Sequence, residues 1–73
     1  MKLDIGLHEC CEVLRANNIK VTEQNFTAMV QAGEFPEWAV PSVDTKQASP
    51  LLSRAGFVKW VKAFYHIEEV RGI

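Results

Sequence analysis

The stretch TEQNFTAMVQAGEFPEWAV, residues 22–40, decides the fold, because a helix ends inside it and an aromatic, proline-containing segment follows at once. Thr22 is expected to cap the helix, since its hydroxyl can accept a hydrogen bond from the first turn. Gly33 favours the left-handed conformation that ends many helices. The apolar side chains between them recur at the i, i+3, i+4 spacing of a buried helix face: Phe26, Met29 and Val30. We therefore predict a helix within residues 22–33.

A second helical pattern precedes this one. Residues 7–16 are predicted to form a helix, with Asp4 as its N-terminal cap and Asn17–Asn18 as its stop. Its apolar residues fall at i, i+3, i+4 and i+7 and are Leu7, Cys10, Cys11 and Leu14. Only about five residues separate the two helices, and so short a connection predicts a helix-turn-helix pair.

The rest of the chain predicts a hairpin and a third helix. FPEWAV (35–40) is expected to form a strand that pairs with LL (51–52), and PSVDTKQASP (41–50) to form the tip between them. Ser53 is expected to cap a third helix over 53–70. The stripe that would close the core is Phe57, Trp60, Val61 and Phe64.

These elements give a mainly α fold with a small β-hairpin, in the order helix, turn, helix, β-wing, helix. Seventy-three residues suffice for one domain, so we expect residues 1–73 to form a single winged helix-turn-helix domain. Its ordered core is expected at about residues 4–67, and the tail 68–73 is expected to fray.

The composition restricts the function. No stretch approaches the roughly 18 apolar residues of a membrane span, and no signal-peptide pattern begins the chain, so we expect a cytoplasmic protein without membrane contact. The two cysteines are adjacent, which suits reduced, buried side chains better than a disulfide. Eight basic and nine acidic residues give a net charge of −1, whereas small DNA-binding domains are more often basic.

Catalysis and cofactor chemistry find little support. The two histidines, His8 and His66, lie at opposite ends of the sequence and share no spacing with a nucleophile. HECC (8–11) supplies three soft ligands, whereas a structural zinc site normally needs four. We therefore expect no enzyme, no metal, no cofactor and no small-molecule substrate.

The outward face of the helix at 22–33 is polar and, apart from Glu23 at its start, uncharged. Amide side chains can bond adenine bidentately, and threonine or alanine methyl groups can contact a thymine methyl group. An ordinary solvated face is the alternative, although such faces usually carry Lys and Glu pairs. The candidate base-reading residues are Gln24, Asn25, Thr27, Ala28 and Gln31. The candidate phosphate contacts are Lys20, Lys46 and Arg54, although each of them alone is more simply a plain surface charge.

The order of elements resembles the winged helix-turn-helix domains of the MerR-like and excisionase class, found in small proteins of phages and mobile elements. GEFPEWAV (33–40) is similar to the G-x-F-P pattern with its apolar strand, and SRAGFVKWV (53–61) to the opening of the third helix. The resemblance spans about residues 7–65. It implies that the second helix enters the major groove and that the wing contacts the backbone or the minor groove.

Two functions follow as hypotheses. The first is a sequence-specific DNA-binding protein, excisionase-like or transcription-regulating, whose partners are double-stranded DNA and a recombinase or a second copy of itself. The second is a protein-interaction module on the same fold, such as an antirepressor or an inhibitor of a host defence or regulatory complex. It is favoured by the net charge and by Trp38 and Tyr65, if these are exposed. For Trp38 we expect instead that it packs the base of the wing onto the third helix.

Overall fold

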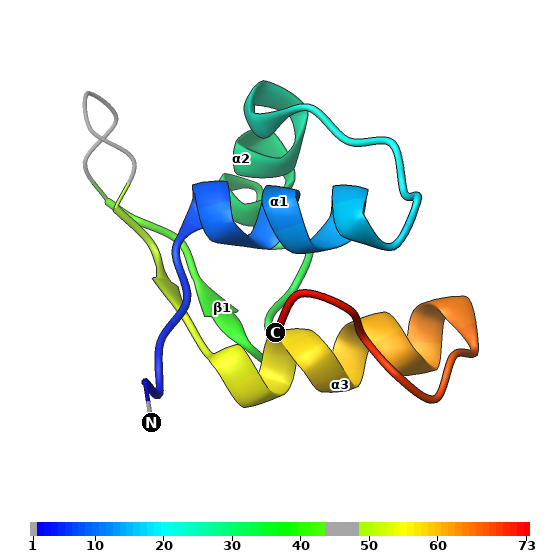
Figure 1. Ribbon diagram of the computed structural model, residues 1–73. Coiled ribbons are helices and arrows are strands. Elements are labelled where there is room, and N and C mark those ends of the chain that lie inside the picture. The colour runs from blue at the N-terminus through cyan, green and yellow to red at the C-terminus, as the bar shows by residue number, and fades with distance from the viewer. Residues whose placement is uncertain (1, 44–48) are drawn as a thin grey trace.

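The computed structural model of the protein describes residues 2–43 and 49–73. It contains three helices and a two-stranded antiparallel hairpin (Figure 1), which confirms the predicted mainly α class and the winged-helix arrangement. In the view of Figure 1, α1 crosses between α2 above and α3 below. The elements are α1 (Leu7–Ala16), α2 (Glu23–Gln31), β1 (Ala39–Val40), β2 (Leu51–Leu52) and α3 (Arg54–Tyr65).

The predicted N-terminal caps of α2 and α3 are confirmed. The Thr22 hydroxyl accepts a hydrogen bond from the Asn25 backbone N–H at 3.1 Å. The Ser53 hydroxyl likewise accepts one from the Gly56 N–H at 3.0 Å. Each bond satisfies a donor that the first helical turn leaves without a partner, so both helices begin where short polar side chains allow it.

The helices end in left-handed residues. Asn18 (φ 63°) follows α1 and Gly33 (φ 78°) follows α2, as predicted. The third helix ends at Tyr65, earlier than predicted, because His66 takes the left-handed conformation with φ 54°. Histidine adopts this conformation more readily than most residues that have a side chain. In the sequence, however, His66 is a single polar residue within an apolar helical pattern, and it did not indicate that the helix ends there.

The strand predicted at 35–40 is much shorter than expected. Only Ala39 and Val40 pair with β2, in the register Ala39 to Leu52 and Val40 to Leu51. The preceding residues form a turn in which the Ala39 N–H donates to the Phe35 carbonyl at 2.9 Å. Pro36 has no N–H to give to a neighbouring strand, which favours this turn over a longer ladder.

The N-terminal segment extends the base of the hairpin, which the sequence did not predict. Asp4 does not cap α1, where Gly6 holds the cap position without a side-chain hydrogen bond. Asp4 instead forms a bridge with Ser53, and the Ile5 N–H donates to the Leu52 carbonyl at 3.2 Å. A pairing of so few residues carries no periodicity and depends on a partner almost fifty positions away.

The core lies where α1, α2, the base of the wing and α3 meet. Phe26 and Phe57 are fully buried, and the two cysteines, Cys10 and Cys11, are buried beside them as predicted. Trp38 is 6% exposed and meets Phe57 edge-on at a centroid distance of 5.4 Å. The prediction that Trp38 packs the wing onto the third helix is therefore confirmed. Burial raises the pKa of the Cys10 thiol to about 12, so it stays protonated at neutral pH.

Phe64 does not belong to the core, contrary to the predicted stripe. Phe57 and Val61 are fully buried, but Phe64 is 62% exposed and stacks on Trp60 at 5.4 Å. The apolar spacing identifies the correct face of α3. The spacing does not show how far along α3 this face is covered, and the last turn of α3 extends beyond the elements that cover it.

The C-terminal segment runs back toward α1 (Figure 1). The Asn17 side chain donates to the Arg71 carbonyl at 3.1 Å and accepts from the Arg71 N–H at 3.0 Å. Ile67 and Val70 are half-buried against the core. The structure thus gives specific contacts to a tail that was expected to fray; whether it frays in solution stays a prediction that amide hydrogen exchange can test.

In residues 2–43 and 49–73, no helix is both long and apolar enough to cross a membrane.

Candidate nucleic-acid interface

Helix α2 is fixed by its inner face and presents its outer face to solvent. Phe26 and Val30 are fully buried, which sets the rotation of the helix about its axis. Gln24, Asn25 and Ala28 are consequently exposed, and Thr27 is half-buried beside them. Four of the five predicted base-reading residues therefore lie on an accessible, uncharged surface.

The fifth, Gln31, is half-buried, and its side chain forms hydrogen bonds within the molecule. Its side-chain oxygen accepts a hydrogen bond from the Ser42 N–H at 2.8 Å, and its amide nitrogen donates to the Ser42 carbonyl at 3.4 Å. Both groups of the amide thus contact the backbone just after β1. In this arrangement Gln31 holds the wing against the end of α2.

Arg54 also has an intramolecular role. Its guanidinium donates two hydrogen bonds to the Glu9 carboxylate, at 2.9 and 2.8 Å, and its Nε donates to the Asp4 carbonyl at 3.0 Å. These hydrogen bonds lower the pKa of the Glu9 carboxyl and raise the pKa of Arg54. The side chain of Arg54 is only 19% exposed, so this cation joins α3 to α1 and is poorly placed for a phosphate.

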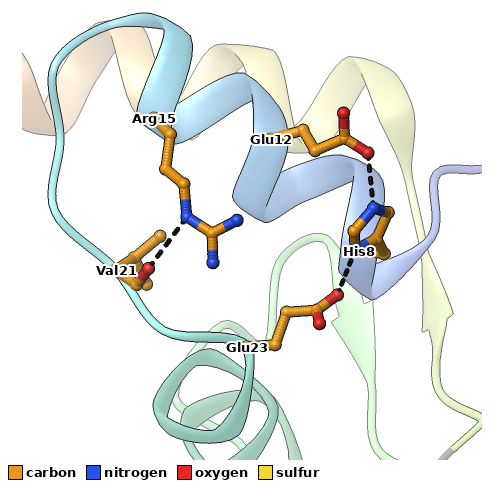
Figure 2. A network of polar contacts seen from close by, with 5 residues as sticks. All are labelled: His8, Glu12, Arg15, Val21 and Glu23. Atoms are coloured by element: carbon orange, nitrogen blue, oxygen red, sulfur yellow. Dashed lines mark hydrogen bonds and ion pairs between the residues drawn. The ribbon is translucent and has the colours of Figure 1, made fainter.

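The turn before α2 carries the accessible cations. Lys20 is exposed, and it lines a hollow of about 780 Å³ together with Arg15, Thr22 and Asn25. Arg15 is oriented by the hydrogen bond from its Nε to the Val21 carbonyl at 3.2 Å (Figure 2). Sequence reasoning missed Arg15, although its position in the last turn of α1, directly before the turn, was the available signal. Lys46 lies outside the described residues.

A polar network of His8, Glu12 and Glu23 joins α1 to the first turn of α2 (Figure 2). The Nδ1 of His8 lies 2.5 Å from Glu23, and its Nε2 lies 2.6 Å from Glu12. A neutral imidazole has one N–H, so donation to both carboxylates requires the protonated ring. The hydrogen bond that the His8 ring donates to the Glu23 carboxylate is the main cause of the raised pKa of His8. The acidic residue that begins α2 is therefore paired with a cation when His8 is protonated.

This network predicts a pH dependence of stability. The folded pKa of His8 exceeds its ordinary value of 6.5, so its stabilisation is complete below that pH and is lost as the pH rises through the folded pKa. In urea unfolding from about pH 5 to pH 9, the wild type should lose stability relative to His8→Gln as the pH rises. A constant difference between wild type and His8→Gln would contradict the pairing.

The described residues contain no cluster of three or more His, Cys, Asp or Glu side chains placed to hold a metal ion. The chemistry that the surface offers is hydrogen bonding from amides, methyl contact and two accessible cations at one end of α2. Comparison with known proteins adds no further assignment: no family model, no curated protein and no solved structure significantly matches the chain.

Proposed function

We propose that this chain is a small, non-enzymatic protein that reads DNA sequence with α2, as an excisionase-like or transcription-regulating factor of a phage or mobile element. The observation that carries the proposal is the outward face of α2, where exposed amides and a methyl group lie beside a hollow with two cations. The proposed kinship with the MerR-like and excisionase class rests on the resemblance of the sequence patterns described above.

Recognition would follow the donor and acceptor pattern of the major groove. Gln24 and Asn25 would each bond N6 and N7 of an adenine, while Thr27 and Ala28 would contact thymine methyl groups. Lys20 and Arg15, at the N-terminal end of α2, would contact backbone phosphates and set the helix in register. The wing would reach the adjoining backbone, and Lys46, which lies outside the described residues, would supply a further phosphate contact.

The affinity of a single copy should be low. Arg54 is paired with Glu9 and Gln31 is bonded to Ser42, so neither is available without breaking an internal contact. Few phosphate contacts remain in a chain of net charge −1. The salt slope should be shallow, because each contact contributes only about 0.9 to the dependence of log K on log salt. A second copy or a recombinase bound beside it would supply the missing affinity.

Fluorescence anisotropy on duplex DNA at low salt tests the proposal. After selection of a preferred site, Gln24→Ala should lower the preference for that site by about 1–3 kcal/mol while binding to random duplex hardly changes. Lys20→Ala serves as the contrasting variant, since it should weaken binding to every sequence and reduce the salt slope by about 1. Absence of binding to any duplex at about 100 μM protein would refute the proposal for the isolated chain.

A protein-interaction module is the second candidate, and one observation favours it. The last turn of α3 exposes Phe64 (62%) and Tyr65 (38%) beside a cleft of about 560 Å³ that reaches Met29 and Phe35. Exposed aromatic side chains of this kind are common anchors in protein interfaces. Trp38 is buried and does not contribute to this surface. A folded chain that binds no duplex in the anisotropy experiment would favour this second function.

A further inference from the structure

A groove of about 720 Å³ lies between the N-terminal segment, one face of α3 and the C-terminal end of the described chain. Its apolar lining includes Leu3 and Ile73, which are 83% and 48% exposed, and Val58, which is half-buried. Isolated exposed apolar side chains are ordinary, but here three of them line one concavity.

The walls of this groove are held by backbone contacts. The Arg54 N–H donates to the Leu3 carbonyl at 2.9 Å, which fixes the N-terminal segment beside the start of α3. Four of the α3 residues that line the groove lie at i, i+3, i+4 and i+7, so they form one face with a length of about 10 Å. They are Ala55, Val58, Lys59 and Lys62. The groove is therefore a formed surface of the fold, long enough for about two turns of a helix.

The charge around the groove is positive. Lys2, Lys59 and Lys62 line it, which places three of the eight basic residues of an overall acidic chain in one place. Within residues 2–43 and 49–73 none of these lysines forms an ion pair, and no Asp or Glu side chain lines the groove. Arg54, the fourth cation there, is already neutralised by Glu9.

We infer that this groove binds a short acidic segment of a partner protein, whose apolar side chains enter the groove while its carboxylates meet Lys2, Lys59 and Lys62. The apolar lining argues for a peptide over nucleic acid, because a phosphate backbone offers nothing that would bury Leu3 or Val58. Its concave shape argues against a membrane surface, which accepts protruding apolar side chains. No α2 residue lines the groove, so the inference stands independently of the proposed DNA contacts.

The test uses the full chain and a fluorescein-labelled peptide of about twelve residues in which pairs of leucine alternate with pairs of glutamate, a length of about three helical turns. Saturable binding with a Kd of roughly 10–100 μM is expected by anisotropy, a weak affinity suited to a small interface. No saturation at about 1 mM protein would overturn the inference.

Two pairs of matched variants locate the binding. Lys62→Glu should weaken it about tenfold or more, whereas Lys20→Glu, the same change of charge outside the groove, should alter it less than about threefold. Leu3→Ser should weaken it, while Leu51→Ser, at another leucine that is 72% exposed, should not. All four sites are exposed, and circular dichroism will verify that the variants fold. Equal losses within either pair would overturn the inference.

Altered probes separate the partner classes. A peptide with serine in place of leucine, and one with lysine in place of glutamate, should both bind at least about tenfold more weakly, because each lacks one half of the recognition. Equal binding of the serine peptide would mean that the groove is only a nonspecific cationic surface, and would overturn the inference. Displacement of the leucine–glutamate peptide by duplex DNA, or by vesicles of anionic phospholipid, would assign the groove to those ligands and overturn the inference.

Discussion

Replacing Phe26 by alanine is expected to abolish cooperative folding or to lower the melting temperature by roughly 12–40 °C. Phe26 is fully buried and stacks with Phe35 at 5.8 Å and with Trp38 at 6.4 Å. A buried Phe→Ala change costs about 3–5 kcal/mol, because the transfer free energy is lost and a cavity remains. The whole stability of a domain of this size is of the same order, about 5 kcal/mol.

Thermal melts followed by circular dichroism, together with urea unfolding, measure this effect. Phe64→Ala is the matched control, since it removes the same atoms from a side chain that is 62% exposed, and should cost less than about 1 kcal/mol. Similar losses for the two variants would mean that α2 does not pack as described, and the assignment of its outward face would fail with it.

Gly56→Ala is expected to destabilise the protein by about 2 kcal/mol, although alanine is the better helix former by about 1 kcal/mol. A Cβ at position 56 would lie 2.3 Å from the Cβ of Trp38, and that atom is anchored directly to the backbone. Either the start of α3 or the base of the wing must move, which disturbs the contact of Trp38 with Phe57. The close approach of α3 to the base of the wing is the reason for glycine here.

The measurement is the urea midpoint of Gly56→Ala beside that of Gly6→Ala. A Cβ at Gly6 would meet nothing within 4 Å, and the φ there is an ordinary −89°. The Gly6 variant should therefore change the stability by less than about 1 kcal/mol. A Gly56→Ala protein as stable as wild type would show that Trp38 is not seated against α3.

Most of the fold could be predicted from local signals in the sequence. Thr22, Gly33 and Ser53 mark the ends of helices, because capping and left-handed turns depend on a few consecutive residues. The spacing of apolar residues likewise identified the buried faces of α1 and α2. The extent of burial was harder to predict, as Phe64 shows, because it depends on which other elements reach that part of the helix.

The candidate site was harder to predict, because contacts with residues distant in the sequence determine which of its side chains remain available for DNA. Arg54 and Gln31 have residue types suited to phosphates and bases, yet Glu9 and the Ser42 backbone engage them. Nothing within a few positions of either residue reveals this. Arg15 shows the opposite case. In the sequence it is an ordinary surface cation, and only the fold of the turn places it beside Lys20 at the candidate site.

The pairing of the N-terminal segment with the start of α3 also has a consequence for folding kinetics. Arg54 bonds Asp4 across 50 positions and Glu9 across 45, and Asn17 bonds Arg71 across 54. The chain must close loops of these lengths before such contacts form, and long sequence separation slows folding. This domain should therefore fold more slowly than a helical bundle of equal length. On the ribosome α1 cannot complete its contacts until α3 has emerged.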